Sequence, residues 1–264
     1  MSHAPSWDRS LAVIFLRHLS SIYHLFLETL RWILVKPFKG KPLRVKAIFF
    51  QMDEVGVKSL PIVCLVSFFI GIILVLQTAY QLEKFGAVNY AASLSSVALT
   101  RELGPLLTAI VVAGRVSAAF TAELGTMMVT EEILALEVMA IHPIAYLVVP
   151  RLLAMVVMLP CLTVVADLVG MVGGYVVGTT AVGIRPSLYI DTALEAMLLK
   201  DILTGLVKSV VFAVIIAMVG CYMALVVQGG AEGVGRSTMI SVVTSLILII
   251  LADCFFTVVF YLFL

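Results

Sequence analysis

The strongest constraint on the fold of this chain is a run from Ser59 to Leu82 that contains no charged side chain. A helix of about 20 apolar residues is long enough to cross the hydrocarbon core of a bilayer. The 264-residue chain is 62% hydrophobic and only 12% charged, whereas a soluble domain carries roughly 25% charged residues. These features predict an all-α integral membrane protein.

Four more long apolar segments follow, and together they predict five transmembrane helices. The predicted spans are residues 59–82, 92–126, 144–182, 202–227 and 239–264. The second and third exceed one straight crossing, so we expect a break at Gly104-Pro105 and a broken or tilted third span containing Pro160. Nine of the 17 Lys and Arg residues precede Leu60, which favours a cytoplasmic N-terminus.

The N-terminal region differs from these spans because polar side chains recur along one face. They are Arg17, Ser21, His24, Glu28 and Arg31. Their spacing of three or four residues favours a helix in the membrane interface over a poor first span. A basic hinge follows. We therefore expect a single domain, with residues 1–58 as interfacial helix and hinge and residues 59–264 as the transmembrane bundle.

Four charged residues interrupt the second predicted span, namely Arg101, Glu102, Arg115 and Glu123. A charge at bilayer depth costs several kcal/mol unless it is paired or hydrated. Arg101 and Glu102 come just before a Gly-Pro pair, where they could form the polar wall of a cavity. Alternatively, they could anchor a helix end, where an Arg side chain reaches the membrane surface. The residues alone leave both interpretations open, and assign no role to Arg115 or Glu123.

Residues 127–143 predict a short helix between the second and third spans. Thr130 can cap it, Glu131 and Glu132 suit its positive N-terminal end, and Pro143 follows it. Its apolar residues are Ile133, Leu134, Leu136, Val138 and Met139. An exposed helix with this composition either docks on a partner or packs on its own bundle.

Small residues recur at four-residue intervals in two of the spans. They are Gly114, Ala118 and Ala122 in the second span, and Gly170, Gly174 and Gly178 in the third. Such faces let helices approach closely, either within one chain or across a homodimer. The four cysteines stand alone in apolar runs and are interpreted as small buried hydrophobic residues. The glycine-rich segment 229–236 lacks a nucleotide-binding pattern and predicts a flexible loop.

Short motifs spread in order over nearly the whole chain resemble the MlaE (YrbE) family of ABC-transporter permeases. They are FIG at 69–71, LQ at 76–77, RELGP at 101–105, AGR at 113–115, TAELG at 121–125, EE…ALEVM…P from 131 to 143, and PR at 150–151. Each motif is weak alone, and the ordered set carries the resemblance.

The resemblance implies a homodimer in the bacterial inner membrane, each copy with an interfacial helix and five transmembrane helices. It implies a cytoplasmic ATPase dimer that binds ATP and Mg, so the permease itself needs no cofactor or metal and is not an enzyme. A STAS-domain protein often accompanies the ATPase, and a periplasmic MCE-domain hexamer sits on the outer face. The cargo is typically phospholipid.

The resemblance also implies two groups of functional residues. The short helix, from Glu131 to Ile141, would be the cytoplasmic coupling helix that docks on the ATPase, through Glu131, Glu132, Leu134, Leu136, Glu137 and Met139. The first span and the start of the second would wall a lipid cavity, with Leu74, Gln77, Thr78, Gln81, Leu82, Phe85, Arg101, Glu102 and Leu103 as lipid-binding residues.

The alternative function is an ion-coupled secondary transporter of a hydrophobic substrate. Asp167, Asp253 and Glu123 would form its relay, and an internal inverted repeat would be expected, but none is convincing. A lipid-modifying intramembrane enzyme would need a nucleophile–base pair or metal ligands, which the sequence does not present. The net charge of +1 gives no indication of nucleic-acid binding.

Overall fold

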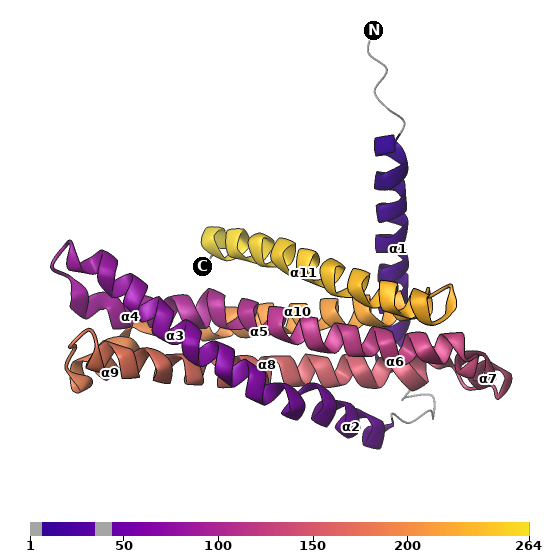
Figure 1. The fold of residues 1–264 in the computed structure, drawn as a ribbon, viewed down its shortest axis with the longest axis horizontal. Helices are drawn as coiled ribbons and strands as arrows, with labels where there is room; N and C mark the ends of the chain where they lie inside the picture. Colours follow the sequence, from indigo (N-terminus) through magenta and orange to yellow (C-terminus); the bar gives the residue numbers. More distant parts are fainter. Residues whose placement is uncertain (1–6, 35–43, 264) are drawn as a thin grey trace, which may run out of the picture.

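The protein is described by a computed structural model that covers residues 7–34 and 44–263, with side chains described for residues 20–34 and 44–262. Within these ranges the chain is helical and contains no strand. Five helical rods are long and apolar enough to cross a membrane. They span Val45–Glu83, Val88–Val129, Ile144–Thr180, Leu199–Leu225 and Gly230–Leu262. The all-α, five-span prediction is therefore confirmed, and the rods form one elongated bundle (Figure 1).

The first rod begins earlier than the uncharged run of the sequence. It consists of α2 (Val45–Val55), the short 3-10 helix η2 (Val57–Ser59) and α3 (Leu60–Glu83). A Cβ atom at Gly56, the junction after α2, would collide with the side chain of Met158 in α8. The rod therefore packs closely on the third rod from its N-terminal part onward.

The second rod is continuous, and the expected break at Gly104-Pro105 is wrong. It contains η3 (Val88–Tyr90), α4 (Ala91–Ala98), α5 (Gly104–Val112) and α6 (Ala118–Val129). Two π-helical turns, η4 (Leu99–Leu103) and η5 (Ala113–Ser117), join the α-helices. Pro105 lies in the first turn of α5, where the missing N–H costs least, and the wider π turn before it accommodates the ring.

The third rod is also unbroken. It consists of the π turn η6 (Ile144–Val148) and α8 (Val149–Thr180), which continues through Pro160. After α9 (Pro186–Ala196), the fourth rod is α10 (Leu199–Leu225) and the fifth is α11 (Gly230–Phe263). Most of the predicted loop at 229–236 is therefore the first part of α11. Gly229 and Gly230 have φ angles of 90° and 69°, so they make the tight turn that suits glycine.

Two further helices lie at one end of the bundle. Helix α7 (Glu132–Val138) forms its tip, and α1 (Trp7–Leu34) stands across the long axis near the same end (Figure 1). We call this the α7 end; α9 and the α3–α4 turn lie at the other. Side chains of Leu25 and Thr29 are buried against the bundle, whereas His24, Glu28 and Arg31 are exposed. The interfacial position of α1 stays a prediction, and the Arg17 side chain lies outside the described residues.

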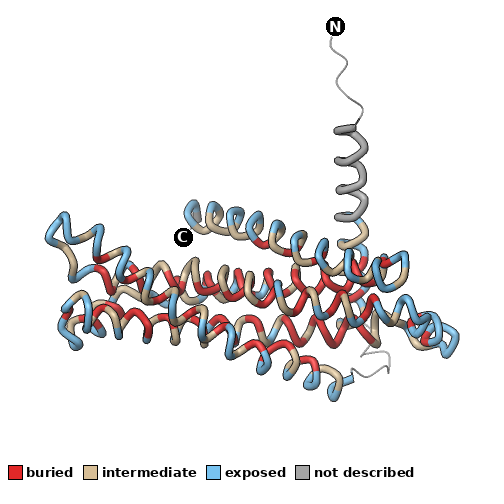
Figure 2. The backbone as a smooth tube through the Cα atoms, in the orientation of Figure 1, coloured by how far each residue is buried: buried red, intermediate tan, exposed pale blue. Residues whose placement is uncertain are grey.

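Buried residues concentrate along the inner faces of α8 and α10, as the tube in Figure 2 shows. Glycines permit the close contact between α3 and α8. A Cβ atom at Gly71 would collide with the backbone of Gly170, and one at Gly173 with the carbonyl of Phe68. Gly170, Gly174 and Gly178 therefore pack inside the chain. Of the cysteines, only Cys221 is fully buried, and Cys161 and Cys254 are exposed, which corrects the expectation that all four are buried.

Candidate functional site

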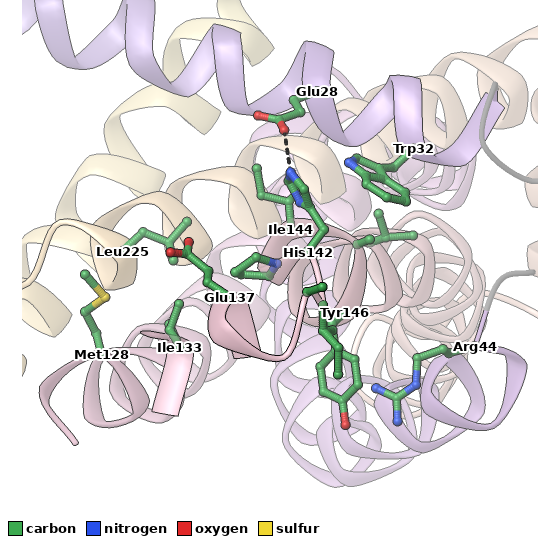
Figure 3. Close-up of a pocket in the computed structure, with 15 residues that line it drawn as sticks. Glu28, Trp32, Arg44, Met128, Ile133, Glu137, His142, Ile144, Tyr146 and Leu225 are labelled. Atoms are coloured by element: carbon green, nitrogen blue, oxygen red, sulfur yellow. Dashed lines mark ion pairs between the residues drawn. The ribbon is translucent and has the colours of Figure 1, made fainter. Parts of the chain in front are cut away.

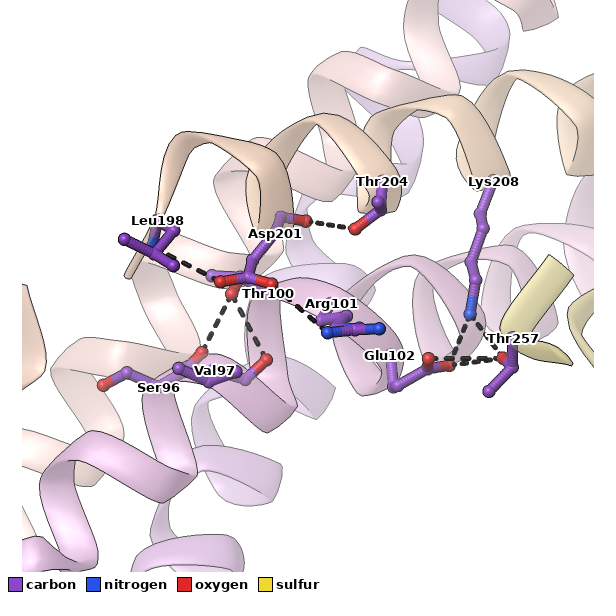
Figure 4. A network of polar contacts seen from close by, with 10 residues as sticks. All are labelled: Ser96, Val97, Thr100, Arg101, Glu102, Leu198, Asp201, Thr204, Lys208 and Thr257. Carbon is purple, nitrogen blue, oxygen red and sulfur yellow. Dashed lines mark hydrogen bonds and ion pairs between the residues drawn. The ribbon is translucent and has the colours of Figure 1, made fainter. Parts of the chain in front are cut away.

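Two charged residues of the second rod, Arg101 and Glu102, take part in a polar network with two other rods (Figure 4). Glu102, on the π turn η4, lies 2.5 Å from the ammonium nitrogen of Lys208 in α10. The same nitrogen lies 2.9 Å from Asp253 in α11 and donates a 2.8 Å hydrogen bond to Thr257. The Lys208 side chain is fully buried. One cation therefore neutralises carboxylates from two rods in an apolar interior, where an unpaired charge is costly.

Arg101, the neighbour of Glu102, reaches a different carboxylate. Its guanidinium lies 3.5 Å from Asp201 at the start of α10, and Asp201 also accepts a hydrogen bond from the backbone N–H of Leu198. The side chains of Arg101 and Glu102 stay about one-third exposed. Both therefore stabilise the bundle and remain accessible from outside the single chain.

Sequence reasoning selected Arg101 and Glu102 but missed their partners, Asp201 and Lys208. A usable signal for Lys208 was present, because it is a lone cation inside the otherwise apolar fourth span. A buried lysine at membrane depth requires a carboxylate partner. The sequence could not show which of the intramembrane carboxylates that partner is.

The predicted lipid-binding residues on α3 and in the turn after it divide into two groups. Gln77, Gln81 and Phe85 are exposed, whereas Leu74, Thr78 and Leu82 are partly buried. The Thr78 hydroxyl donates to the Leu74 carbonyl at 2.7 Å, and Leu82 packs on the cluster around Val75 and Ala79. The partly buried Leu103 ends the π turn η4. The exposed group is therefore the part of the set that is open to a ligand or a second chain.

Arg115 and Glu123, which the sequence left without a role, join the second rod to its neighbours. Arg115 donates hydrogen bonds of 2.9 Å to the carbonyl of Glu54 and 2.6 Å to the Ser59 hydroxyl. Glu123 lies 2.9 Å from the guanidinium of Arg151, which is buried in α8. The two contacts tie η5 to α2 and α6 to α8.

Asp167 has a different environment from the other intramembrane carboxylates. Its carboxylate lies against Gly104, where a Cβ atom would collide with Oδ1. This Oδ1 atom is buried and has no hydrogen-bond partner among the described residues. The contact explains why glycine occupies position 104. The three acids of the hypothetical relay thus have separate surroundings, and no metal-binding group of three His, Cys, Asp or Glu occurs in the part of the chain that the structure describes.

The ends of α7 differ from the prediction. Thr130 does not cap it: the N-cap is Glu131, with a φ of 60°, and the Thr130 hydroxyl donates to the Thr126 carbonyl and to Glu132. The helix ends at Val138 rather than at Ile141. Ala140 has a φ of 58°, and the N–H groups of Ala140 and Ile141 bond the carbonyls of Glu137 and Leu136. This is a Schellman motif in which alanine occupies the usual glycine position.

Helix α7 has one buried and one exposed face. Ile133 and Leu136 belong to the hydrophobic core of the bundle, so Leu136 is not on the exposed face, which corrects its assignment as a docking residue. Leu134, Val138 and Met139 are 54%, 81% and 61% exposed. Glu131, Glu132 and Glu137 are exposed around them. The result is an apolar patch with an acidic border at the tip of the molecule.

Behind α7, a cavity of about 940 Å³ separates it from the end of α1 (Figure 3). Glu28 of α1 lies 3.3 Å from the Nε2 atom of His142. The rings of Trp32 and His142 are 4.9 Å apart, and the Arg44 guanidinium lies 3.7 Å above the Tyr146 ring. The contacts of Glu28 and Trp32 connect α1, and the contact of Arg44 connects the start of α2, to the segment that follows α7.

The predicted packing residues of the second rod are more accessible than those of the third. Gly114 is exposed, with no atom within 4 Å of a Cβ built on it. Ala118 and Ala122 are partly buried. This face is therefore open to a second chain, whereas the glycines of α8 are covered by α3 and Tyr189.

Fold and site together define a multi-pass helical membrane protein with paired internal charges and an exposed apolar patch at one tip. Comparison with known proteins gives its family. The chain belongs to the MlaE permease family, whose sequence model, described as Permease MlaE, matches residues 48–259.

Curated relatives agree with this membership. A probable ABC transporter permease protein of Rickettsia typhi is 40% identical over 85% of each chain. Another, of Synechocystis, is 44% identical over 78% of each chain. The chloroplastic protein TRIGALACTOSYLDIACYLGLYCEROL 1 of Arabidopsis thaliana is 37% identical over 84% of this chain and 63% of its own. The protein is thus an ABC-transporter permease, a non-catalytic membrane subunit whose ATPase is a separate chain.

Proposed function

We propose that this permease works as a homodimer that moves phospholipid between the bacterial inner membrane and a periplasmic MCE-domain hexamer. A cytoplasmic ATPase dimer, accompanied in some assemblies by a STAS-domain protein, drives it. The observation that carries the proposal is the apolar patch of Leu134, Val138 and Met139 on α7. Three exposed apolar side chains on so short a helix are stabilised when a partner covers them.

The position of α7 in the chain supports its proposed role as a coupling helix. Helix α7 connects the second rod, which carries Glu102, to the third rod, which packs on α3. We therefore expect a movement of α7 to be transmitted to both rods. The N-terminal excess of Lys and Arg supports a cytoplasmic α7 end. ATP and Mg would be held by the ATPase, and this chain would contribute only the docking surface.

Two features support lipid as the cargo. Gln77 and Gln81 are exposed one helical turn apart on α3, among exposed apolar residues such as Ile73 and Leu76. Polar side chains at such positions normally face a cavity or another protein surface. In addition, the name of the Arabidopsis relative contains that of a glycolipid. We propose that two copies enclose a cavity lined by α3, with Arg101 and Glu102 near the headgroup.

The docking proposal is tested by co-purification of the ATPase. Val138→Asp combined with Leu134→Asp should lose most of the bound ATPase, because two carboxylates would have to be desolvated in the contact. Leu194→Asp, an exposed leucine on α9 at the opposite end, is the matched control and should retain it. Full ATPase recovery with the double variant would contradict the assignment of α7.

The transport proposal is tested with the intact complex. Mass spectrometry should find phospholipid bound to the purified assembly, and reconstituted complex should transfer labelled phospholipid only when ATP is supplied. The ion-coupled alternative predicts transfer by the permease alone under an ion gradient. Transport without the ATPase would therefore favour that alternative.

A further inference from the structure

A second polar cavity, separate from the Glu102 network and from α7, opens between α2, η5 and α6. Its volume is about 300 Å³, roughly ten times the volume that one water molecule occupies in the liquid. It is lined by Phe50, Gln51, Glu54, Val55, Arg115, Val116, Ala119, Phe120 and Glu123. Both charged and aromatic side chains therefore face the same space.

The cavity lies toward the α7 end of the bundle rather than at its middle. At 1.5 Å per residue, Gln51 and Glu54 are within about 15 Å of Val45, the first residue of α2. The first rod contains 39 residues and is about 58 Å long, which is well beyond the roughly 30 Å hydrocarbon core. Its terminal part thus reaches the headgroup layer. The exposed ring of Phe50 borders the cavity where acyl chains would pass.

One lining residue has an unused hydrogen-bond acceptor. Gln51 is only 7% exposed, and its Oε1 atom has no hydrogen-bond partner among the described residues. A buried carbonyl oxygen of this kind is stabilised by a donor from a ligand or from water. Oε1 itself has almost no accessible surface, so a rotation of the Gln51 side chain would be needed to present it to the cavity. This unused acceptor is the observation that favours a binding site over a plain gap between helices.

The remaining polar groups provide both signs of charge. The Arg115 guanidinium, about one-third exposed, contacts Glu54 and Ser59, and its five N–H donors leave capacity for an anion. The carboxylates of Glu54 and Glu123 are also partly exposed. A cation-binding side and an anion-binding side therefore lie within one cavity.

We propose that this cavity binds the zwitterionic headgroup of a membrane aminophospholipid. The phosphate would bind Arg115, and the ammonium group would donate to Gln51 Oε1 and to the nearby carboxylates. A primary ammonium carries N–H donors and a quaternary ammonium has none, so the site selects phosphatidylethanolamine over phosphatidylcholine. The site is distinct from the lipid cavity on α3 and does not depend on which cargo the transporter carries.

The test uses the intact purified permease in detergent and native mass spectrometry. Phosphatidylethanolamine and phosphatidylcholine with identical acyl chains are supplied at equal concentration. Wild type should retain the ethanolamine lipid about threefold to tenfold better, the factor expected for one added hydrogen bond. Gln51→Leu should remove this preference. Gln228→Leu, a substitution of an exposed glutamine outside the cavity, is the matched control and should keep it.

Other outcomes would overturn the proposal. Equal retention of the two lipids by wild type would exclude headgroup selection here. Equally strong binding of soluble glycerophosphoethanolamine would overturn a membrane lipid as the ligand. If Gln51→Leu fails to fold, the site is tested instead by crosslinking a photoactivatable phosphatidylethanolamine to the wild-type permease. Its adducts should map to peptides containing Phe50–Glu54 or Ala119–Glu123, and adducts confined elsewhere would contradict the site.

Discussion

The ammonium nitrogen of Lys208 lies 2.5 Å from the carboxylate of Glu102, and the lysine side chain is fully buried. The two residues belong to the fourth and second rods, and Asp253 adds the fifth rod at 2.9 Å. Three of the five rods are therefore joined by one cation. Because this contact starts on a π turn next to Pro105, the geometry of that turn and the ion pairs depend on each other.

Lys208→Met should strongly destabilise the protein. It leaves two carboxylates without their cation, and breaking a buried ion pair costs about 3–5 kcal/mol. Thermal unfolding in detergent measures the loss. The triple variant Lys208→Met, Glu102→Gln, Asp253→Asn removes all the charges and should recover much of it. A triple variant as unstable as the single one would show that the cation's charge is not the important property.

Gly173→Ala should loosen the contact between α3 and α8. The new Cβ atom would meet the carbonyl of Phe68, and overpacking of this kind costs about 1–3 kcal/mol. Gly114→Ala adds the same methyl group at a position with no neighbour within 4 Å. It should not destabilise the single chain, because alanine is favoured over glycine inside a helix, while it should alter any contact between copies. Size-exclusion chromatography and thermal unfolding separate the two effects, and equal destabilisation would refute the packing argument.

Ala140→Gly should stabilise the end of α7. Ala140 has a φ of 58°, a left-handed conformation that costs an L-residue about 1–2 kcal/mol and costs glycine little. The greater freedom of glycine in the unfolded chain offsets part of this gain, roughly 0.5–1 kcal/mol. Ala135→Gly, inside α7, is the opposite control and should destabilise by about 1 kcal/mol. If the two variants change the free energy of unfolding in the same direction, the Schellman assignment is contradicted.

Tyr189 should remain neutral in alkaline solution at which an exposed tyrosine ionises. Burial raises the pKa of its hydroxyl from 10.0 to about 12. Because the folded state holds this proton more tightly, stability from this group is present below pH 10 and is lost as pH rises toward 12. The difference in tyrosinate absorbance between wild type and Tyr189→Phe reports the titration. A midpoint near that of free tyrosine would show that the ring is hydrated.

The sequence predicted the features that depend on local composition. Each of the five spans is a long apolar segment. In a bilayer such a segment forms a helix, because a helix satisfies the backbone hydrogen bonds internally. The helix of α7 was also predictable, because Glu131 and Pro143 border a short apolar run. Its exact ends were not, because Glu131 and Ala140 adopt positive φ angles that their residue types do not indicate.

The wrong predictions concern residues whose effect depends on neighbours. Gly104-Pro105 reads as a helix breaker, yet Gly104 makes room for Asp167 and Pro105 follows a π turn. Leu134 and Leu136 are the same residue type on the same short helix, but only Leu136 faces the core. Small residues recur at four-residue spacing on both the second and the third rods. Only the face on the second rod is open to a second chain, because α3 and Tyr189 cover the glycines of the third.

By itself, the sequence determined a five-span helical membrane protein with a short helix between the second and third spans, because hydropathy and helix length are local quantities. Only the tertiary structure decided which charges meet. Lys208 pairs with Glu102 and Asp253, Arg101 with Asp201, and Arg151 with Glu123. Each pair joins residues that are distant in sequence, and the cost of an unpaired charge requires some partner without specifying which one. Helix packing made that choice.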